Sequence, residues 1–314
     1  MRIAAFALSV LSLAVPAAHA EAPASEGQKA ILVTGASTGI GRKVTERLAA
    51  DGYFVYAGAR KDADIAELNA IKNVQALRLD VTKPDEIAAA VATVTQGGRG
   101  LWGLVNNAGV AIVGPFADTK EEDFDFVMDV NAYGPFRMTK AFIPLVTASK
   151  GRIVTISSIS GILSSGRLGV YSMSKHAIEA FGDSLAVQME PLGVKVSLIE
   201  PGNYNSQIGA SAEKRLGAAA SIGDRSRYKE PDEVAAAVEL ALFEPTPKRR
   251  YMVVPNQEEA AVTIRKAIEE LVQLNEGQPY TYSREALVGM LDEALKTARP
   301  ATAPVPSPDA VNAD

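Results

Sequence analysis

The chain has 314 residues, of which 47% are hydrophobic and 22% charged, and its formal net charge is −5. It contains no cysteine and two histidines, which excludes disulfide scaffolds, thiolate metal sites, iron–sulfur clusters and thiol nucleophiles. Among metal sites, only a magnesium or calcium site made of carboxylates is compatible with this composition, and we assign no metal ligand. The negative charge argues against a nucleic-acid-binding surface, so a small-molecule partner is expected.

The first twenty residues have the pattern of a secretory signal peptide. Arg2 precedes an apolar run over residues 3–15, and small residues lead up to Ala20. As a helix this run is about 20 Å long, shorter than the roughly 30 Å hydrocarbon core of a bilayer. We therefore expect Sec-type export to the periplasm or the medium, cleavage after Ala20, and a linker at 21–28. The alternative is an uncleaved N-terminus that leaves the protein cytoplasmic or associated with a membrane, without a stable span.

Seven short runs rich in β-branched residues follow, separated by helical patterns. The expected strands are 30–34, 53–57, 76–79, 101–105, 152–156, 195–199 and 250–254. The expected helices include 41–50, 62–71, one from about 85, and one around 171–189. This alternation predicts an α/β fold over residues 29–255: a Rossmann-like, doubly wound, seven-stranded parallel sheet with helices on both faces. The ligand crevice of such a sheet lies at the carboxyl ends of the strands.

A C-terminal helical extension is expected over residues 256–298. It contains two amphipathic segments, 258–275 and 283–297, and the first carries an apolar stripe. The stripe consists of Ile264, Ile268, Leu271 and Leu274. We expect it to pack against the main core, with a subunit contact or a lid over the substrate as alternatives. Residues 299–314 hold four prolines and no aromatic residue, and a disordered tail is predicted there.

Residues 34–41 read Thr-Gly-Ala-Ser-Thr-Gly-Ile-Gly and lie between the first expected strand and the first helix. Glycines at such a turn let the backbone approach a pyrophosphate, and the N–H groups of the helix terminus face the phosphates. The nucleophile elbow of serine hydrolases is a rival interpretation, but no upstream loop is available for the oxyanion hole. Dinucleotide contacts are therefore predicted for Gly35, Ser37, Thr38, Gly39, Ile40 and Gly41.

The end of the second expected strand bears on the choice of cofactor. A carboxylate near this point usually binds the ribose hydroxyls of NAD. Arg60 and Lys61 stand here instead, and a guanidinium suits a 2′-phosphate. We predict a preference for NADP over NAD, although Asp62 and Asp64 lie nearby and a solvated basic turn is the alternative.

A proton-transfer group is predicted on the helix that begins near Tyr171. The four-residue spacing places Tyr171 and Lys175 on one face, one turn apart. A free phenol titrates at about pH 10, and a nearby ammonium favours its ionised form. Ser158, at the end of the preceding strand, offers a hydroxyl for a substrate oxygen, with Ser157 and Ser160 as competing candidates.

From about Ala30 to Val254 the chain resembles the short-chain dehydrogenase/reductase family. The motifs that carry the resemblance are, in order, Thr34 to Gly41, Asp80-Val81, Asn106-Asn107-Ala108-Gly109, Asn131, Ser158, Tyr171, Lys175 and Pro201-Gly202. The loop after Pro201-Gly202 departs from the family pattern, because the frequent threonine is not evident in residues 203–206.

The resemblance implies hydride transfer between a nicotinamide and a carbonyl or secondary alcohol. Tyr171 would be the general acid/base, Lys175 would lower its pKa, and Ser158 would orient the substrate oxygen. Asn131 would hold a water that links Lys175 to solvent. The implied cofactor contacts are Asp80, Val81, Asn107, Ala108, Gly109, Tyr171, Lys175, Pro201 and Gly202. Members of the family commonly form homodimers or homotetramers.

The expected substrate boundary is apolar, which favours a lipophilic ketone or alcohol, steroid- or retinoid-like by analogy. Its candidate residues are Val110, Ala111, Ile112, Val113, Ile162 and Leu163, with loop packing as the alternative. Two other functions remain open: a dinucleotide-binding sensor without turnover, and a sugar-nucleotide epimerase or dehydratase. His176 and Trp102 are interpreted as structural.

Overall fold

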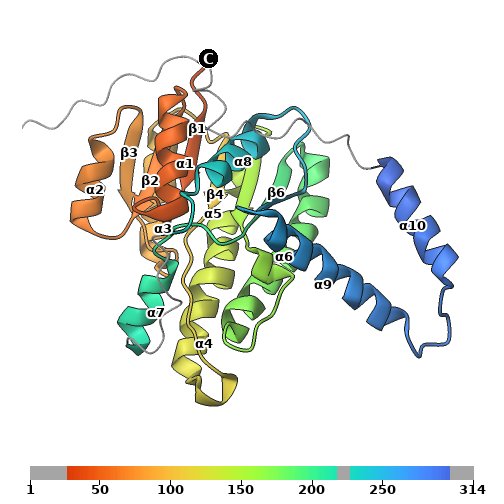
Figure 1. Ribbon diagram of the computed structural model, residues 1–314. Helices are drawn as coiled ribbons and strands as arrows, with labels where there is room; N and C mark the ends of the chain where they lie inside the picture. The colour runs from red at the N-terminus through yellow and green to blue at the C-terminus, as the bar shows by residue number, and fades with distance from the viewer. Residues whose placement is uncertain (1–26, 218–226, 298–314) are drawn as a thin grey trace, which may run out of the picture.

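The computed structural model describes residues 27–217 and 227–297 (Figure 1). The expected signal peptide, most of the linker and the C-terminal tail lie outside the described residues. Within the described part, seven strands form one sheet. They are β1 Ala30–Val33, β2 Phe54–Ala59, β3 Val74–Arg78, β4 Gly103–Asn106, β5 Arg152–Ile156, β6 Lys195–Pro201 and β7 Arg250–Val253.

The sheet has the order β3-β2-β1-β4-β5-β6-β7, and every pair of neighbours is parallel. The predicted doubly wound α/β fold is therefore confirmed, with strand boundaries shifted by one or two residues at most ends. β3 starts two residues before its expected start, directly after Asn73, whose φ of +67° ends the preceding turn. β6 runs on to Pro201, so the strand itself delivers Glu200 and Pro201 to the carboxyl edge.

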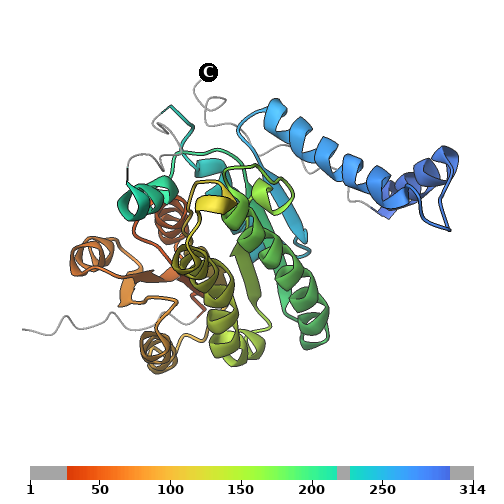
Figure 2. The same cartoon turned by 90° about the horizontal axis from the view of Figure 1, so that it is seen from below.

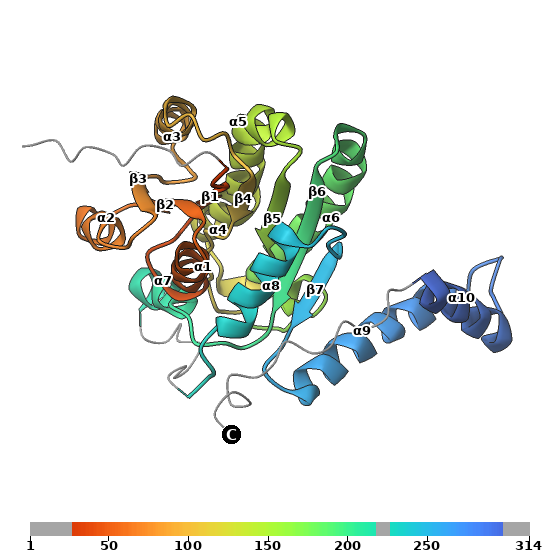
Figure 3. The ribbon, with the colours of Figure 1, turned by 90° about the horizontal axis from the view of Figure 1, so that it is seen from above.

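The described helices are α1 Gly39–Ala50, α2 Asp62–Asn69, α3 Pro84–Gln96, α4 Glu121–Met128, α5 Gly134–Ala148, α6 Gly169–Met189, α7 Ile208–Leu216, α8 Asp232–Phe243, α9 Gln257–Asn275 and α10 Arg284–Thr297. Seen from above, α3, α5 and α6 cover one face of the sheet, and α1, α2 and α8 cover the other (Figure 3). Each face has its own apolar core, centred on Leu104 and Phe142 on one side and on Val33 and Leu48 on the other. Because both faces are covered, the central strands β1 and β4 are buried at every position.

The C-terminal helices are present as predicted, but their expected packing on the core is wrong. α9 leaves the sheet beyond β7, and α9 and α10 extend away from the body as an arm in all three views (Figures 1, 2 and 3). The stripe predicted to be buried is exposed: Ile264, Ile268 and Leu271 are each about half exposed, and Leu274 is 78% exposed. An amphipathic pattern shows that a helix has an apolar face, but it does not specify what covers that face.

Among residues 27–217 and 227–297, no helix combines the length and the apolar character needed to cross a membrane.

Candidate active site

The glycine-rich turn connects β1 to α1 in a conformation that requires glycine. Gly35 and Gly39 have φ values of +65° and +54°, in the left-handed region. A Cβ atom at Gly41 would lie 2.2 Å from the carbonyl oxygen of Gly35, so only glycine lets the turn close against the helix. α1 begins at Gly39, with Thr38 at its N-cap position, and the N–H groups of its first turn are oriented toward the turn. This is the backbone arrangement that binds a pyrophosphate.

Asn107 holds the turn in place from the end of β4. Its Nδ2 donates to the carbonyl oxygens of Thr34 and Gly35, at 2.8 and 3.1 Å. In return, the hydroxyl of Thr34 accepts hydrogen bonds from the backbone N–H groups of Asn107 and Ala108, at 2.9 and 3.0 Å. Asn107 and Ala108 therefore brace the glycine turn. The resemblance predicted them as cofactor contacts; the structure gives them this supporting position.

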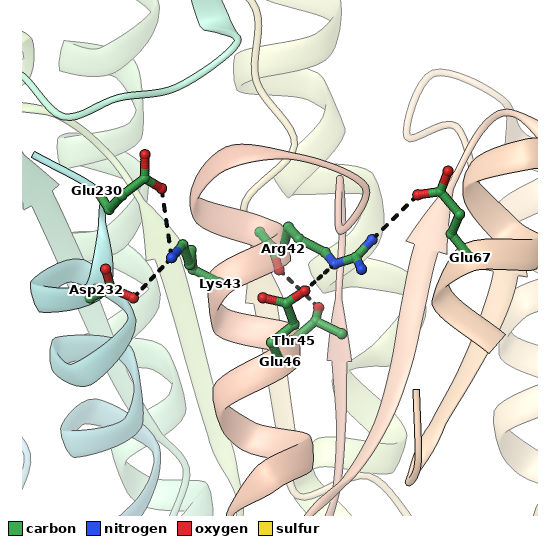
Figure 4. Close-up of polar contacts among 8 residues, drawn as sticks. Arg42, Lys43, Thr45, Glu46, Glu67, Glu230 and Asp232 are labelled. Atoms are coloured by element: carbon green, nitrogen blue, oxygen red, sulfur yellow. Dashed lines mark hydrogen bonds and ion pairs between the residues drawn. The ribbon is translucent and has the colours of Figure 1, made fainter. Parts of the chain in front are cut away.

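Charged contacts on both sides fix the first two turns of α1 (Figure 4). Lys43 lies 3.2 Å from Asp232 and 3.6 Å from Glu230, at the start of α8. Arg42 forms an ion pair of 2.6 Å with Glu46 and lies 3.8 Å from a carboxylate oxygen of Glu67 in α2 (Figure 4). Arg42 and Lys43 are thus paired with acids of α1 itself, of α2 and of the start of α8.

Basic side chains gather at the carboxyl ends of β2 and β3. Arg60 has a 63% exposed side chain, and its Nη1 lies 3.9 Å from an Asp80 carboxylate oxygen. Arg78 donates to the carbonyl oxygen of Arg60 at 2.7 Å and pairs with Asp62. Sequence reasoning missed Arg78, because the pairing of β3 beside β2 brings it there. Lys61 occupies the N-cap position of α2, beside this group.

Asp80 and Val81 follow β3 at the same edge. One carboxylate oxygen of Asp80 accepts from the backbone N–H and the hydroxyl of Thr82, at 3.0 and 2.8 Å. Val81 is 4% exposed and touches α5 so closely that a Cβ atom at Gly134 would lie 2.7 Å from its side chain. The side chain of Val81 is therefore part of the core, whereas the carboxylate of Asp80 lies at the edge, near Arg60.

Tyr171 and Lys175 lie on the buried face of α6, as predicted from their spacing, and are 9% and 4% exposed. The Lys175 Nζ donates to the carbonyl oxygen of Ile156 at 2.9 Å and lies 5.6 Å from the centre of the Tyr171 ring. Burial lowers the pKa of the Lys175 ammonium to about 8, against the opposing charge of Glu179. The pair thus combines a buried phenol with a buried ammonium of lowered pKa.

Ser158 stands at the end of β5 and caps the short helix η3, Ile159–Gly161. Its Oγ accepts from the backbone N–H of Ser160 at 3.1 Å and donates to the carbonyl oxygen of Pro201 at 3.5 Å. Ser158 is 8% exposed, and its competitor Ser157 is only 2% exposed. Ser158 is therefore a helix cap that also contacts the loop after β6, and its role toward the substrate stays a prediction.

Asn131 lies in a π-helical turn, η2 Asp129–Tyr133, between α4 and α5. Single π turns of this kind are frequent at functional sites. The Asn131 side chain is 1% exposed and makes its hydrogen bonds with Val110 and Ser174. Gly109 lies near two of these polar groups: a Cβ there would be 3.6 Å from the Asn131 Oδ1 and 4.0 Å from the Lys175 Nζ, which is ordinary contact distance.

The loop after Pro201-Gly202 supplies a hydroxyl that sequence reasoning missed. Ser206 lies beside the glycine turn, where a Cβ at Gly39 would be 3.4 Å from the Ser206 Cβ. Members of the family often have a threonine in this loop; in this chain the hydroxyl residue is Ser206, four residues after Gly202. Tyr204 is 1% exposed and its hydroxyl donates to Glu233.

The predicted apolar boundary divides into two parts. Val110, Ala111, Ile112 and Val113 are all at least 92% buried, and Val110 and Ile112 belong to the core, so this segment packs inside the protein. Ile162 and Leu163, after η3, are half-buried.

His176 and Trp102, which were interpreted as structural, both contact other residues of the fold. The His176 Nδ1 lies 2.8 Å from the carbonyl oxygen of Ser172, within α6. The Trp102 indole N–H donates to Leu242 at 2.9 Å, and the Lys29 Nζ lies 3.5 Å from the centre of its ring.

The family model for short chain dehydrogenases matches residues 29–217. Mitochondrial D-beta-hydroxybutyrate dehydrogenase of Rattus norvegicus is 39% identical over 210 residues, covering 64% of this chain and 61% of that protein. Retinol dehydrogenase 7 of Mus musculus is 38% identical over 184 residues, covering 57% of this chain and 58% of that protein. The solved short-chain dehydrogenase from Streptomyces avermitilis has a TM-score of 0.67 and 28% identity, covering 88% of this chain and 100% of its own.

The chain therefore belongs to the short-chain dehydrogenase/reductase family, as its motifs indicated. Its alignments span about three fifths of the length of these two relatives. The remainder of each relative has no counterpart in these alignments.

Proposed function

We propose that the protein is an NAD(P)-dependent oxidoreductase that interconverts a secondary alcohol and a carbonyl compound. One observation carries this proposal: Tyr171 and Lys175 share the buried face of α6, and the Lys175 Nζ binds the Ile156 carbonyl, two residues before Ser158. The carboxyl edge of the sheet thereby brings an acid/base, its cation and a hydrogen-bond donor to one place, beside the glycine turn.

Each of these side chains has a separate task. The nicotinamide, when bound, supplies or accepts the hydride. Tyr171 donates a proton to the substrate oxygen during reduction and takes it back during oxidation. Lys175 favours the phenolate form of Tyr171 by its positive charge, and Ser158 holds the substrate oxygen by a hydrogen bond. Asn131 fixes the backbone of the neighbouring loop and, in this proposal, holds the relay water near Lys175.

The donor groups of the chain fit a dinucleotide that carries an extra phosphate. The first turn of α1 offers N–H groups to the pyrophosphate. Arg60 is largely exposed at the tip of β2, with Arg78 beside it, and guanidinium groups bind phosphate oxygens in pairs. Asp62 is engaged by Arg78 and so is turned toward that cation. This arrangement supports NADP over NAD.

The proposed substrate is a lipophilic alcohol or ketone. Ile162 and Leu163 are the half-buried apolar residues next to Ser158, and they support an apolar substrate wall. Two of the relatives are named as a D-beta-hydroxybutyrate dehydrogenase and a retinol dehydrogenase. Of these, the retinol type matches an apolar wall better.

We further propose that the chain is exported after cleavage at Ala20 and that it works as a homo-oligomer. The basic start, apolar run and small residues of segment 1–20 support export. The exposed apolar face of the arm supports self-association. Mass spectrometry of the mature N-terminus in fractionated cells tests the first statement, and the mass in solution tests the second.

The replacement Tyr171→Phe tests the reaction. Turnover of lipophilic alcohols, followed by absorbance at 340 nm, should fall about 1,000-fold, while dinucleotide affinity stays within about three-fold. Tyr282→Phe, on the arm, is the matched control and should keep full activity. If Tyr171→Phe retains activity within ten-fold, Tyr171 is not the acid/base. If the wild type binds dinucleotide but changes no substrate, the protein is a binding module.

A further inference from the structure

The loop that follows β6 is held by residues from the C-terminal part of the chain. Gly202 N–H donates to the carbonyl oxygen of Val253 at 2.8 Å, just past the edge of the sheet. Asn203 N–H donates to a carboxylate oxygen of Glu259 at 2.8 Å. The first two backbone N–H groups of the loop are thus bound by elements that follow it in sequence.

Glu259 lies in the first turn of α9 and is oriented by the cap of that helix. The Asn256 Oδ1 accepts from the Glu259 N–H at 2.9 Å, and the Asn256 Nδ2 lies 3.3 Å from the Glu259 Oε1. This reciprocal pair is a variant of the capping box. One carboxylate oxygen is therefore held by the cap, and the other, Oε2, is aimed at the loop.

Gly202 is the residue that lets this carboxylate reach the loop. A Cβ atom at position 202 would lie 2.1 Å from the Glu259 Oε2, far inside the distance of closest approach. The family motif Pro201-Gly202 therefore has a specific reason in this chain: the glycine makes room for an acid from the arm. The hydrogen bond from Asn203 is charge-assisted, the stronger kind.

Both ends of the loop touch the candidate active site. At its start, the carbonyl oxygen of Pro201 accepts from the Ser158 hydroxyl at 3.5 Å. At its end, Ser206 lies against Gly39 in the glycine turn. A displacement of Asn203 would move both ends, so the carboxylate of Glu259 restrains the side of the site between the serine and the pyrophosphate turn.

We propose that Glu259 is a positioning residue of the active site, which acts by fixing the loop Pro201–Ser206 through the backbone of Asn203. The proposal rests on the proposed function and adds the C-terminal arm to it. Only the first turn of α9 takes part; the apolar stripe of the arm begins at Ile264, more than one turn further along the helix. In this chain, a carboxylate from outside the sheet does the work of ordering the nicotinamide-side loop.

The test compares three variants of Glu259 with one control in the full chain. Glu258→Ala is the control, because Glu258 is an exposed acid in the same helical turn. Glu259→Ala should lower kcat/KM for the dinucleotide about ten-fold relative to that control. Glu259→Gln keeps an acceptor of the same length and should restore activity to within about three-fold. Glu259→Asp keeps the charge but shortens the reach, and should resemble the alanine variant.

Two readouts do not depend on turnover. Hydrogen exchange of the Asn203 amide in the dinucleotide-free protein should accelerate at least ten-fold in Glu259→Ala and stay unchanged in Glu258→Ala. Dinucleotide affinity, measured by calorimetry, should weaken in Glu259→Ala and recover in Glu259→Gln. These readouts retain their meaning even if the wild type turns over no alcohol, so a failure of the proposed reaction is distinguishable. Equal exchange rates in both variants, or activity of Glu259→Ala within two-fold of the control, would overturn the proposal.

Discussion

The side-chain amide of Asn131 satisfies both backbone polar groups of Val110. Its Oδ1 accepts from the Val110 N–H at 2.9 Å, and its Nδ2 donates to the Val110 carbonyl at 2.8 Å. The same Nδ2 lies 2.9 Å from the Ser174 hydroxyl, which in turn donates to the Tyr171 carbonyl at 2.7 Å. One buried amide therefore joins the loop after β4 to the helix that carries the acid/base.

Replacing Asn131 should therefore affect stability as well as activity. In Asn131→Ala the N–H and the carbonyl of Val110 stay buried without these partners, and each lost bond costs about 1–2 kcal/mol. We expect the free energy of unfolding to fall by about 2–4 kcal/mol in urea titrations, with activity reduced at least ten-fold. Asn69→Ala, which removes one exposed amide contact to Ala76, is the control and should cost less than about 1 kcal/mol. A loss no larger than this control would show that Asn131 does not support the loop.

The glycine turn should not tolerate a methyl group at position 41. Because the Cβ would lie 2.2 Å from the Gly35 oxygen and 2.4 Å from the Asn107 Nδ2, Gly41→Ala must displace the turn or the helix. Dinucleotide affinity should drop at least 100-fold by calorimetry. Gly166→Ala is matched to it, since nothing lies within 4 Å of its added Cβ, and should bind normally. Normal binding by Gly41→Ala would contradict the assignment of the turn.

The cation at the tip of β2 should determine cofactor preference. Arg60→Ala is expected to lower the ratio of kcat/KM for NADP to that for NAD by about 10- to 100-fold, because a charge-assisted contact to the phosphate is lost. Arg47→Ala is the control. It removes an ion pair between α1 and Glu239 of α8, and it should leave the ratio unchanged. A wild-type preference below three-fold would exclude Arg60 as the discriminating residue.

A buried carboxyl near α6 should make the stability of the fold depend on pH. Burial, and then the negative charges of Glu179 and Asp183, raise the pKa of Glu200 to about 7 against the opposing charge of Arg250. The folded state then holds this proton more tightly than the unfolded chain, so its stabilising effect is complete below about pH 4.5 and is lost as the pH rises through about 7.

Urea titrations at about pH 5 and pH 8 measure this effect. The wild type should lose up to about 3 kcal/mol more than Glu200→Gln over that interval, since one pKa unit corresponds to about 1.4 kcal/mol. Glu269→Gln, an exposed acid on α9, serves as the control and should follow the wild type. Parallel pH profiles of wild type and Glu200→Gln would assign the proton to another group.

The sheet could be predicted from the sequence because buried parallel strands are short segments rich in β-branched and apolar residues, separated by helical patterns. The strand Arg152–Ile156 is buried along its whole length and carries three branched aliphatic residues, and its limits match the prediction to the residue. The candidate site followed from spacing, since Tyr171 and Lys175 lie one turn apart on any regular helix. A spacing within one helix can be recognised without knowing which other elements pack against that helix.

Contacts between distant segments could not be predicted in the same way. Arg78 reaches the Arg60 carbonyl only because β3 pairs with β2, and Glu259 meets Asn203 across 56 residues of sequence. The prediction that the arm packs on the core was wrong. The apolar stripe from Ile264 to Leu274 shows that one face of the helix is apolar, but it does not identify the surface that covers this face. Val110 to Val113 were expected at the substrate, with loop packing as the alternative; all four are buried, and Val110 and Ile112 belong to the core.

The anchor of Lys175 has a consequence for how this site tolerates mutation. Its ammonium is held by the carbonyl oxygen of Ile156, a main-chain atom. Every amino acid provides that oxygen, so no substitution at position 156 that leaves β5 in place removes the acceptor. The side chain at position 156 can therefore be replaced by another apolar side chain that packs as well. The ammonium of Lys175 keeps its hydrogen bond to the main chain in each case.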